Sequence, residues 1–476
     1  MMYHLGIFFF LVVHGTHLVV GNHVSSFTPR ASTDKALYLI YFHDDVDSSK
    51  RTDYARDLEK ALPENHTQAI TLHNKILTIA AVLTESQVSK WKTDSIEAIE
   101  SDDSEVDIDG NFDDSTIHAR DRYHDTFTPN SNAFRDFPEM LFLSQPPRTE
   151  LEECPDYAYD DTAGRGVDVY VQDTGINRKH IEFKNPTERD NFPRKGSIET
   201  LYPKSSRFGN LFFRSSPDKD DDGHGTCVSD KIIGTKYGSA KSANLFLVPT
   251  ETNFKALAAL LGSLTKARMV FYFAGLAAII EHIEKRRREN KDAFPPVVNW
   301  SYGLLVDEKK HKKTLDQWRD FVRRLDKLGA TMIAASGNAA HIAGREEVDE
   351  YPALFAKEFK SVIPVGSVDI HGVKSTFSQG GPLVKVHAPG RVDEHRGMPC
   401  AGKKGERDWN VDPKNEGTSY STGTISGIAA VKIGSDPGVR TGNTGEKVAA
   451  WLYRWAYIRE GGDVPSVWNT EIPDIC

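Results

Sequence analysis

The sequence predicts an α/β fold with a doubly wound, mainly parallel sheet, preceded by a small α+β domain. From about residue 165 onward, short apolar runs alternate with helical stretches, as expected for strands buried on both faces of a parallel sheet. Ahead of this region, residues 36–83 follow a strand, helix, strand pattern, and a highly acidic tract separates the two parts. The chain has 476 residues, which is enough for two or three folding units.

Residues 1–21 are expected to form a secretory signal peptide. Residues 5–13 (LGIFFFLVV) are apolar but too few to span a bilayer, and LVVG follows before the expected cleavage after Gly21. No Lys or Arg precedes the apolar run, so a buried N-terminal strand is the alternative interpretation. The signal peptide predicts a secreted, extracellular protein.

A second apolar stretch, residues 256–280, is interpreted as a core helix rather than a membrane span. It carries Lys266 and Arg268 near its centre, and two cations are costly to place in lipid. The formal net charge of −9 gives no reason to expect nucleic acid or an anionic membrane as a partner.

The chain has four cysteines, which a secreted setting allows to form disulfides. Three pairings are open, and the sequence does not choose among them. No C-x-x-C pair or His/Cys cluster has the spacing of metal ligands, and the sequence requires no cofactor. The four residues are Cys154, Cys227, Cys400 and Cys476.

The small domain is predicted from a β-rich run at 36–42 (ALYLIYF), helical spacing at 53–62 and a second β-like run at 76–84. Residues 85–92 read as the start of another helix. The acidic tract that follows, residues 96–114, is expected to be a solvated linker.

In the larger region, helices are expected over residues 276–290 and 315–329, between strands. Ligands of doubly wound sheets bind beyond the carboxyl ends of the strands, so polar residues there are candidates for chemistry. The expected strands are the apolar runs GVDVYVQD (166–173), ANLFLVPT (243–250), PPVVNWSYG (295–303), TMIAASGN (331–338) and SVIPVGSVD (361–369).

Four polar residues lie at such places. Asp173 ends the first strand, His224 stands between two glycines, and Asn338 follows a buried strand. Ser419 follows Gly-Thr at a predicted helix start. Each alone has a structural explanation, as a turn residue, a structural histidine or a helix N-cap.

In this order, the four residues resemble the active site of the subtilisin-like serine proteases, in which aspartate, histidine and serine follow one another along the chain. The resemblance covers about residues 165–435. It rests on short motifs: VYVQDTGI from Val169 with His180 and Phe183 after it, D-x-x-G-H-G-T from Asp220, GSA from Gly238, NWSYG from Asn299 and GTSYS from Gly417.

The resemblance implies a secreted serine endopeptidase. Ser419 would be the nucleophile, His224 its base and Asp173 the group that orients the histidine. Asn338, with the Ser419 backbone N–H, would bind the oxyanion. Two further segments would bind substrate: Ser301, Tyr302 and Gly303 as a strand beside the peptide, and Ala335, Ser336 and Gly337 as the other wall of a roomy, apolar specificity pocket.

The resemblance also implies a zymogen. Residues 36–108 would be an inhibitory propeptide, 109–160 an acidic linker and N-terminal extension, and 161–476 the peptidase domain. Autocleavage is expected at about residues 108–125. The expected partners are protein or peptide substrates and the chain's own propeptide as an intramolecular inhibitor, and the enzyme is expected to be a monomer.

Some positions depart from the family pattern. In HGTCVSD, Cys227 and Asp230 replace a histidine and a glycine, and Cys227 is interpreted as a buried small hydrophobe in preference to a free thiol. Gly423 and Ser426 replace a proline and an alanine after Ser419. The acidic run 218–222 is interpreted as a solvated turn, with structural calcium as the alternative.

The alternative function is a catalytically silent secreted relative that keeps the sheet and binds peptides. The presence of all four chemical groups favours the protease.

Overall fold

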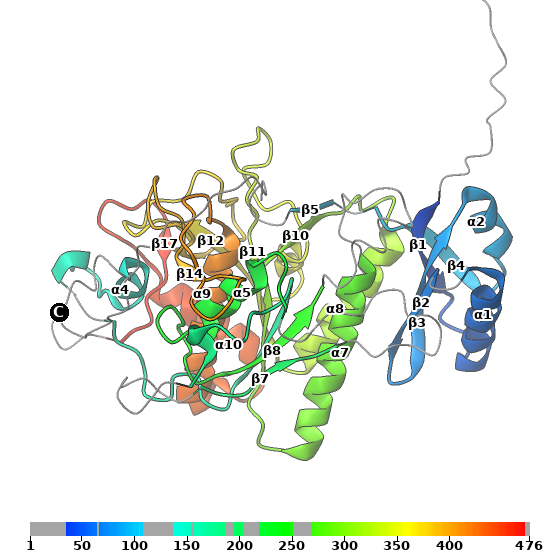
Figure 1. The fold of residues 1–476 in the computed structure, drawn as a ribbon, viewed down its shortest axis with the longest axis horizontal. Coiled ribbons are helices and arrows are strands. Elements are labelled where there is room, and N and C mark those ends of the chain that lie inside the picture. Colours follow the sequence, from blue (N-terminus) through cyan, green and yellow to red (C-terminus); the bar gives the residue numbers. More distant parts are fainter. Residues whose placement is uncertain are drawn as a thin grey trace, which may run out of the picture.

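The computed structural model describes residues 35–63, 66–103, 105–107, 137–153, 157–185, 195–202, 219–250 and 269–471 (Figure 1). The expected signal peptide, the expected cleavage interval and two of the cysteines, Cys154 and Cys476, lie outside these residues. Figure 1 shows a small unit at one end, coloured blue, against a larger α/β unit.

Within the described residues, the small unit is a four-stranded antiparallel sheet in the order β2-β3-β1-β4. Strand β1 is buried on both faces, which explains its unbroken apolar run: Leu39 faces the larger unit, whereas Ile40 packs with α1. Its elements are β1 (Ala36–Phe42), α1 (Ser48–Ala61), β2 (Thr67–Leu72), β3 (Lys75–Leu83), α2 (Glu85–Trp91) and β4 (Ile96–Ser101).

The first strand and both helices of this unit are confirmed, and β3 confirms the second predicted strand. The interpretation of residues 96–114 as linker is wrong at its beginning, because residues 96–101 form β4 beside β1. The acidic side chains suggested a solvated segment in the sequence. In the structure, Glu100 instead accepts a hydrogen bond from the larger unit.

The larger unit contains a nine-stranded sheet among the described residues, in the order β16-β17-β13-β12-β11-β9-β6-β8-β7. Every pairing is parallel except that of β16 with β17. The five predicted strands are confirmed as β6, β8, β9, β11 and β12. The strands are β6 (Asp168–Asp173), β7 (Ile198–Thr200), β8 (Asn244–Pro249), β9 (Val297–Trp300), β11 (Thr331–Ala335), β12 (Val362–Val368), β13 (Val386–Pro389), β16 (Tyr457–Ile458) and β17 (Pro465–Ser466).

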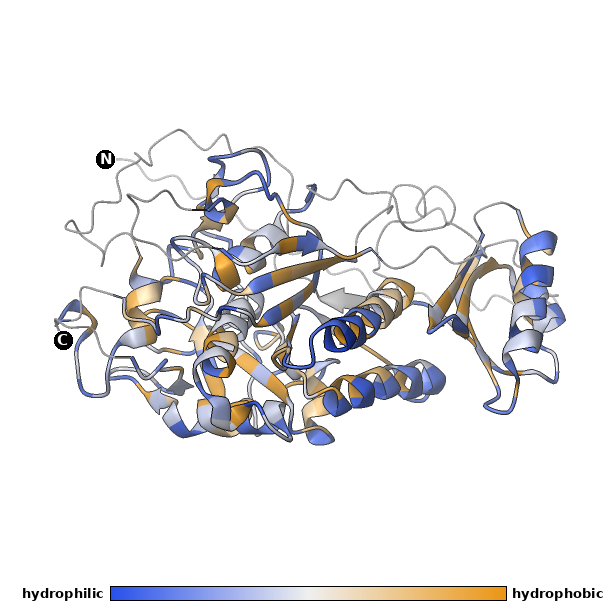
Figure 2. Ribbon diagram, turned by 90° about the horizontal axis from the view of Figure 1, so that it is seen from below, coloured by the Kyte–Doolittle hydropathy of each residue, from blue (hydrophilic) through white to orange (hydrophobic). Residues whose placement is uncertain are grey.

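Helices cover both faces of this sheet. Successive residues of β6 show the two layers: Tyr170 packs in the core that holds α7 and α8, and Val171 in the core that holds α5, α9 and α10. Figure 2 shows hydrophobic residues concentrated on the strands and hydrophilic ones on the outer helix faces. The helices are α5 (His224–Ile233), α7 (Met269–Glu289), α8 (Lys312–Lys327), α9 (Thr418–Ser435) and α10 (Thr444–Trp455).

Helix α4 (Pro138–Ser144) and the 3-10 turn η1 (Leu151–Glu153) lie in the expected N-terminal extension. Every residue of α4 is buried, and its apolar side chains join the core of α5, α9 and α10. Arg459 also donates to the Phe142 carbonyl. This part of the extension therefore packs as part of the larger unit.

The remaining short elements are β5 (Glu105–Asp107), β10 (Gly303–Leu305), β14 (Cys400–Ala401), β15 (Trp409–Asn410), η2 (Ile181–Phe183), η3 (Ala353–Lys357) and η4 (Pro437–Val439). None of the helices in the described part of the chain has the length and apolar character needed to cross a membrane.

Candidate active site

Asp173 and His224 form a buried pair where β6 ends and α5 begins. Asp173 Oδ1 accepts a hydrogen bond from His224 Nδ1 at 2.7 Å and another from the Thr174 backbone N–H at 2.7 Å. The two side chains are 3% and 1% exposed. A buried carboxylate at Nδ1 favours the tautomer with its proton there, which leaves Nε2 as the basic nitrogen.

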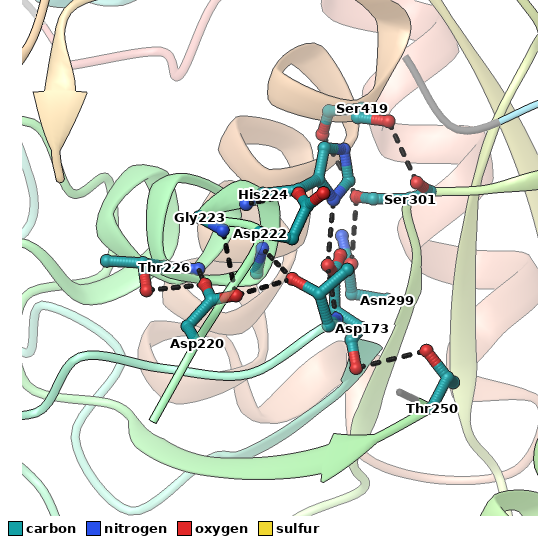
Figure 3. Close-up of polar contacts among 12 residues, drawn as sticks. Asp173, Asp220, Asp222, Gly223, His224, Thr226, Thr250, Asn299, Ser301 and Ser419 are labelled. Carbon is teal, nitrogen blue, oxygen red and sulfur yellow. Dashed lines mark hydrogen bonds and ion pairs between the residues drawn. The ribbon is translucent and has the colours of Figure 1, made fainter. Parts of the chain in front are cut away.

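The Asp220 carboxylate bonds to the N-terminus of α5 (Figure 3). Its Oδ1 accepts from the Gly223 N–H at 2.8 Å and from the Thr174 hydroxyl at 2.9 Å. Its Oδ2 accepts from the Thr226 N–H at 2.8 Å and its hydroxyl at 2.6 Å. These bonds satisfy backbone donors of the first helical turn and join the helix to the residue after Asp173.

The interpretation of the acidic run as a solvated turn is wrong for Asp220, which is 3% exposed. Burial raises the pKa of its carboxyl, against the opposing effect of the hydrogen bonds from Thr226 and Gly223. The spacing D-x-x-G-H-G-T was the sequence signal for this role.

Gly225 permits the close approach of α5 to β6. A Cβ at Gly225 would lie 2.4 Å from the Gly175 carbonyl oxygen and 3.0 Å from Asp173 Oδ1. A larger residue would therefore push the helix away from the carboxylate that His224 requires.

Ser419 is the second residue of α9 and is buried. Its hydroxyl donates to the Ser301 carbonyl at 2.8 Å, and the Ser301 hydroxyl donates to the Ser419 carbonyl at 3.0 Å. Figure 3 shows the His224 ring between the Asp173 carboxylate and Ser419. The next side chain, Tyr420, lies against the His224 ring, with 5.8 Å between ring centroids.

Asn338 follows β11 and bonds to the N-terminus of α9. Its Oδ1 accepts from the Thr418 backbone N–H and from the Thr418 hydroxyl, each at 3.0 Å. These bonds direct the amide oxygen toward the helix, so Nδ2 is the group left to act as a donor. Sequence-predicted Asp173, His224, Asn338 and Ser419 are thus brought to the carboxyl edge of the sheet.

The predicted substrate-binding segment at Ser301–Gly303 connects β9 to β10. The Tyr302 side chain points into the core, where its hydroxyl donates to Gln172 at 2.9 Å, so only its backbone can face a peptide. Strand β10 pairs antiparallel with β5, with Gly303 opposite Asp107. A strand of the same chain therefore occupies the edge that was expected to bind substrate.

The second predicted segment, Ala335–Gly337, runs from the end of β11. Ser336 is buried and donates its hydroxyl to the Gln379 carbonyl at 2.8 Å. Gly337 has a φ of +106°, a conformation that other residues rarely adopt. The segment is thus held rigidly by its neighbour strand and by Gln379.

Two carboxylates of the small unit bond to helix N-termini of the larger one. Asp102 accepts from the backbone N–H groups of Met269 and Val270, at 2.8 and 3.2 Å, at the start of α7. Glu100 accepts from the Lys313 and Thr314 N–H groups, at 2.9 and 3.0 Å, at the start of α8. Negative charge at a helix N-terminus is favourable, so these contacts hold the two units together.

Cys227 forms a disulfide with Cys400, which overturns its interpretation as an unbonded buried hydrophobe. The two residues are separated by 173 positions, so only the fold brings them together. Asn415 lies against both sulfurs, with Nδ2 at 3.6 and 3.5 Å, and accepts a 2.5 Å hydrogen bond from the Tyr420 hydroxyl. The disulfide and Asn415 thus connect the helix of His224 with Tyr420, the residue after Ser419.

Asp230 is fully buried, and its Oδ2 accepts from the Ala401 N–H at 2.7 Å, beside the disulfide. Burial, and then the charge of Glu182, raise the pKa of its carboxyl well above the usual range, and Lys231 opposes this. Asp230 therefore has backbone and charge partners that the sequence did not identify.

The departures after Ser419 leave α9 as one helix from Thr418 to Ser435. A Cβ at Gly423 would lie 3.0 Å from the Val228 carbonyl oxygen, so the glycine allows α5 and α9 to pack closely. The Ser426 hydroxyl donates to the Thr422 carbonyl at 2.8 Å and accepts from Asn299 at 3.0 Å.

Within the described ranges, no group of three or more His, Cys, Asp or Glu residues could hold a metal ion.

Comparison with known proteins places these features in a family. The model of the subtilase family (Peptidase_S8) matches residues 164–464. Over 275 residues the chain is 30% identical to subtilisin-like protease 2 of Trichophyton verrucosum and 29% identical to that of Trichophyton rubrum. Each match covers 58% of this chain and 52% of the relative, so the chain spans about half the length of the curated relatives it matches.

Among solved structures, the epidermin leader peptide processing serine protease from Staphylococcus aureus has a similar fold. Its TM-score is 0.57 at 15% identity, over 93% of this chain and 97% of that one. The similarity therefore includes a domain ahead of the sheet as well as the sheet. The chain, with its small α+β domain before a subtilisin-type sheet, belongs to the subtilase family.

Proposed function

We propose that the chain is a secreted serine endopeptidase that hydrolyses peptide bonds through an acyl-enzyme and is made as an autoprocessed zymogen. The observation that carries the proposal is the buried Asp173–His224 hydrogen bond beside Ser419 at the N-terminus of α9. A nucleophile, a base and an orienting carboxylate together are the requirements of acyl transfer.

In the proposed reaction, Ser419 Oγ attacks the peptide carbonyl carbon while His224 Nε2 takes the hydroxyl proton. Asp173 stabilises the imidazolium through its bond to Nδ1. The C–N bond then breaks, His224 gives its proton to the leaving amine, and the acyl group stays on Ser419. Water, deprotonated by His224, releases the acid and restores the hydroxyl.

The tetrahedral intermediate carries its negative charge on the former carbonyl oxygen. Asn338 Nδ2 and the Ser419 backbone N–H would donate to this oxygen, and the dipole of α9 favours negative charge there. Removing one such donor costs about 2.7–4 kcal/mol of transition-state stabilisation, a magnitude measured in subtilisin.

The Ser419 hydroxyl must change partner before this reaction, because it donates to the Ser301 carbonyl in this structure. A substrate N–H that bonds to the same carbonyl would compete for it. Substrate binding would therefore favour rotation of the hydroxyl toward His224.

The small domain is proposed to be the inhibitory propeptide. Strand β5 occupies the β10 edge where a peptide substrate would pair. The Asp102 and Glu100 contacts to α7 and α8 anchor the domain beside that edge. Cleavage at about residues 108–125 would free the peptidase from the covalent link.

Secretion is supported by the Cys227–Cys400 disulfide, since disulfides persist mainly in oxidising compartments. The apolar run at residues 5–13 agrees with export.

The test is labelling of the secreted protein with a fluorophosphonate probe, which reacts with an activated serine. Wild type should be labelled and Ser419→Ala should not. Ser421→Ala is the matched control, because Ser421 lies in the same helix and its hydroxyl donates to the Ala388 carbonyl; it should label like wild type.

N-terminal sequencing of the labelled band should place its start near residues 108–125. A folded wild-type protein that never labels, even after the small domain is removed, would contradict the protease. Peptide binding by that unlabelled protein would support the catalytically silent alternative.

A further inference from the structure

Gly303, at the predicted substrate edge, lies directly against the carboxylate of Glu350. A Cβ at Gly303 would lie 1.7 Å from Glu350 Oε2. The Glu350 side chain is 1% exposed, and its neighbour Tyr351 holds β10 through paired backbone hydrogen bonds with Leu304, at 2.8 and 3.0 Å. The carboxylate is therefore fixed beside the first of the two predicted pocket walls.

Gly337, in the opposite wall, lies against a second acceptor oxygen. A Cβ at Gly337 would lie 1.8 Å from Gln379 Oε1. Gln379 Nε2 donates to the Arg345 carbonyl, the Glu347 carbonyl and Asp349 Oδ1, each at 2.8 Å. Three acceptors fix the amide orientation, and buried Oε1 has no hydrogen-bond partner among the described residues.

One cation and two carboxylates among the described residues lie around these oxygens. Arg345 bonds to Asp349 Oδ2 at 2.7 Å and also to Glu350 Oε1. One guanidinium thus serves two carboxylates, so these three residues carry a net charge of −1. A cation that reaches the buried Glu350 carboxylate would gain an ion pair, and it would need hydrogen bonds of its own to offset its desolvation.

Resting on the proposed function, we propose that the specificity pocket between residues 301–303 and 335–337 binds a Lys or Arg side chain, with Glu350 as the residue that sets this preference. The side chain concerned belongs to the residue whose carbonyl carbon Ser419 attacks, called P1. Because Gly303 and Gly337 have no side chains, these acceptor oxygens lie where a Cβ would be, so a polar pocket is proposed in place of the expected apolar one. Gln379 Oε1 would accept a hydrogen bond from the same cation.

The preference can be measured with a series of fluorogenic peptides that differ only at P1, with Lys, Arg, Phe, Leu or Glu. Wild type should hydrolyse the Lys and Arg peptides with kcat/KM at least about 10-fold above the Phe peptide. Glu350→Gln should lower the Lys and Arg values about 10- to 100-fold and leave the Phe value nearly unchanged. The glutamine can still accept from Arg345, so the fold should persist.

Asp349→Asn is the matched control, because Asp349 also pairs with Arg345 but is not the carboxylate that lies against Gly303, and an asparagine Oδ1 can still accept from Gln379. It removes the same charge from the cluster and should change P1 preference much less than Glu350→Gln. Faster hydrolysis of Phe or Leu than of Lys by wild type would overturn the inference, as would equal effects of the two variants.

Probe labelling tests the proposed protease activity separately from the P1 preference. An enzyme that is labelled by the fluorophosphonate probe but prefers Phe at P1 would support the proposed function and overturn the basic P1 preference. If nothing labels, binding to Ser419→Ala can still be followed by fluorescence anisotropy with peptides ending in Lys or Phe, after an added protease has removed the small domain. Tighter binding of the Lys peptide, abolished by adding Glu350→Gln, supports the pocket, and the reverse order overturns it.

The chain's own processing gives a second readout. Within residues 108–125, Arg120 and Arg122 are the only Lys or Arg residues. A basic P1 preference predicts a mature N-terminus at Asp121 or Tyr123. A mature N-terminus within the interval that follows an acidic or apolar residue would contradict it.

Discussion

The disulfide between Cys227 and Cys400 connects the helix that begins with His224 to the strand β14. Cys227 lies one turn after His224 and is completely buried. Asn415 contacts both sulfurs and the Tyr420 hydroxyl, so the same bond also supports the residue after Ser419. The covalent link thus joins the helix of the proposed base to β14, and Asn415 connects it by hydrogen bonds to the helix of the proposed nucleophile.

Replacing both cysteines, Cys227→Ser with Cys400→Ser, should lower the free energy of unfolding by about 2–5 kcal/mol. The bond closes a loop with a sequence separation of 173, and long loops lose the most unfolded-state entropy when closed. Urea unfolding of the variant and wild type measures the difference. Equal midpoints and slopes would show that the link adds no stability.

Asp220→Asn should reduce kcat/KM about 10- to 100-fold with little change in KM. The amide would present a donor to groups that now donate to Asp220, which should displace His224 from Asp173. A displacement near 1 Å can cost about 100-fold in rate. Asp221→Asn is the control, because the Asp221 side chain is exposed and pairs with exposed Lys219. Equal kinetics in both variants would exclude the positioning role.

Asp102→Ala should weaken the attachment of the small domain to the peptidase by about 1–2 kcal/mol. It removes a carboxylate from the N-terminus of α7 and leaves the Met269 and Val270 N–H groups without it. After processing, protease activity should appear sooner than in wild type. Asp94→Ala, an exposed position in the same domain, is the control. An unchanged lag with Asp102→Ala would contradict the anchoring role.

His387 should make the protein less stable in acid. Burial lowers the pKa of His387 to about 4, against an ordinary value of 6.5, and its bond to the Pro465 carbonyl only partly opposes this. The unfolded chain therefore binds the proton first as pH falls. Its contribution to stability is complete above about pH 6.5, and about 2 kcal/mol is lost by pH 5 and about 3 kcal/mol by pH 4.

His387→Asn removes the titration and keeps a donor for Pro465, so the free energy of unfolding should depend less on pH between 4 and 7. Urea titrations across this range, with exposed His371→Asn as control, measure the effect. A pH dependence identical to wild type would show that His387 does not cause the acid loss.

The sequence by itself determined the strands with strong local patterns and the positions of the proposed chemistry. Residues 168–173 and 331–335 are buried on both faces, so their apolar runs identified β6 and β11 without tertiary information. Asp173 and Asn338 lie where those strands end, which the doubly wound pattern predicts for functional residues. Ser419 was found because its neighbours form a specific motif.

Only the tertiary structure decided features that depend on contacts between distant segments. Glu100 in strand β4 accepts a hydrogen bond from the N-terminus of α8, and no local pattern in the sequence indicates that partner. The sequence allowed several cysteine pairings. The packing of α5 brings Cys227 next to Cys400, which is 173 positions away.

The character that we propose for the specificity pocket depends on the same kind of contact. In the sequence, Gly303 and Gly337 predict a roomy pocket. The atoms that lie against these glycines belong to Glu350 and Gln379, which are distant in the sequence. Local sequence determines how a segment folds, because its hydrogen bonds and periodicity are short-range. Charge next to a site depends on which segments the core brings together, and that requires the complete fold.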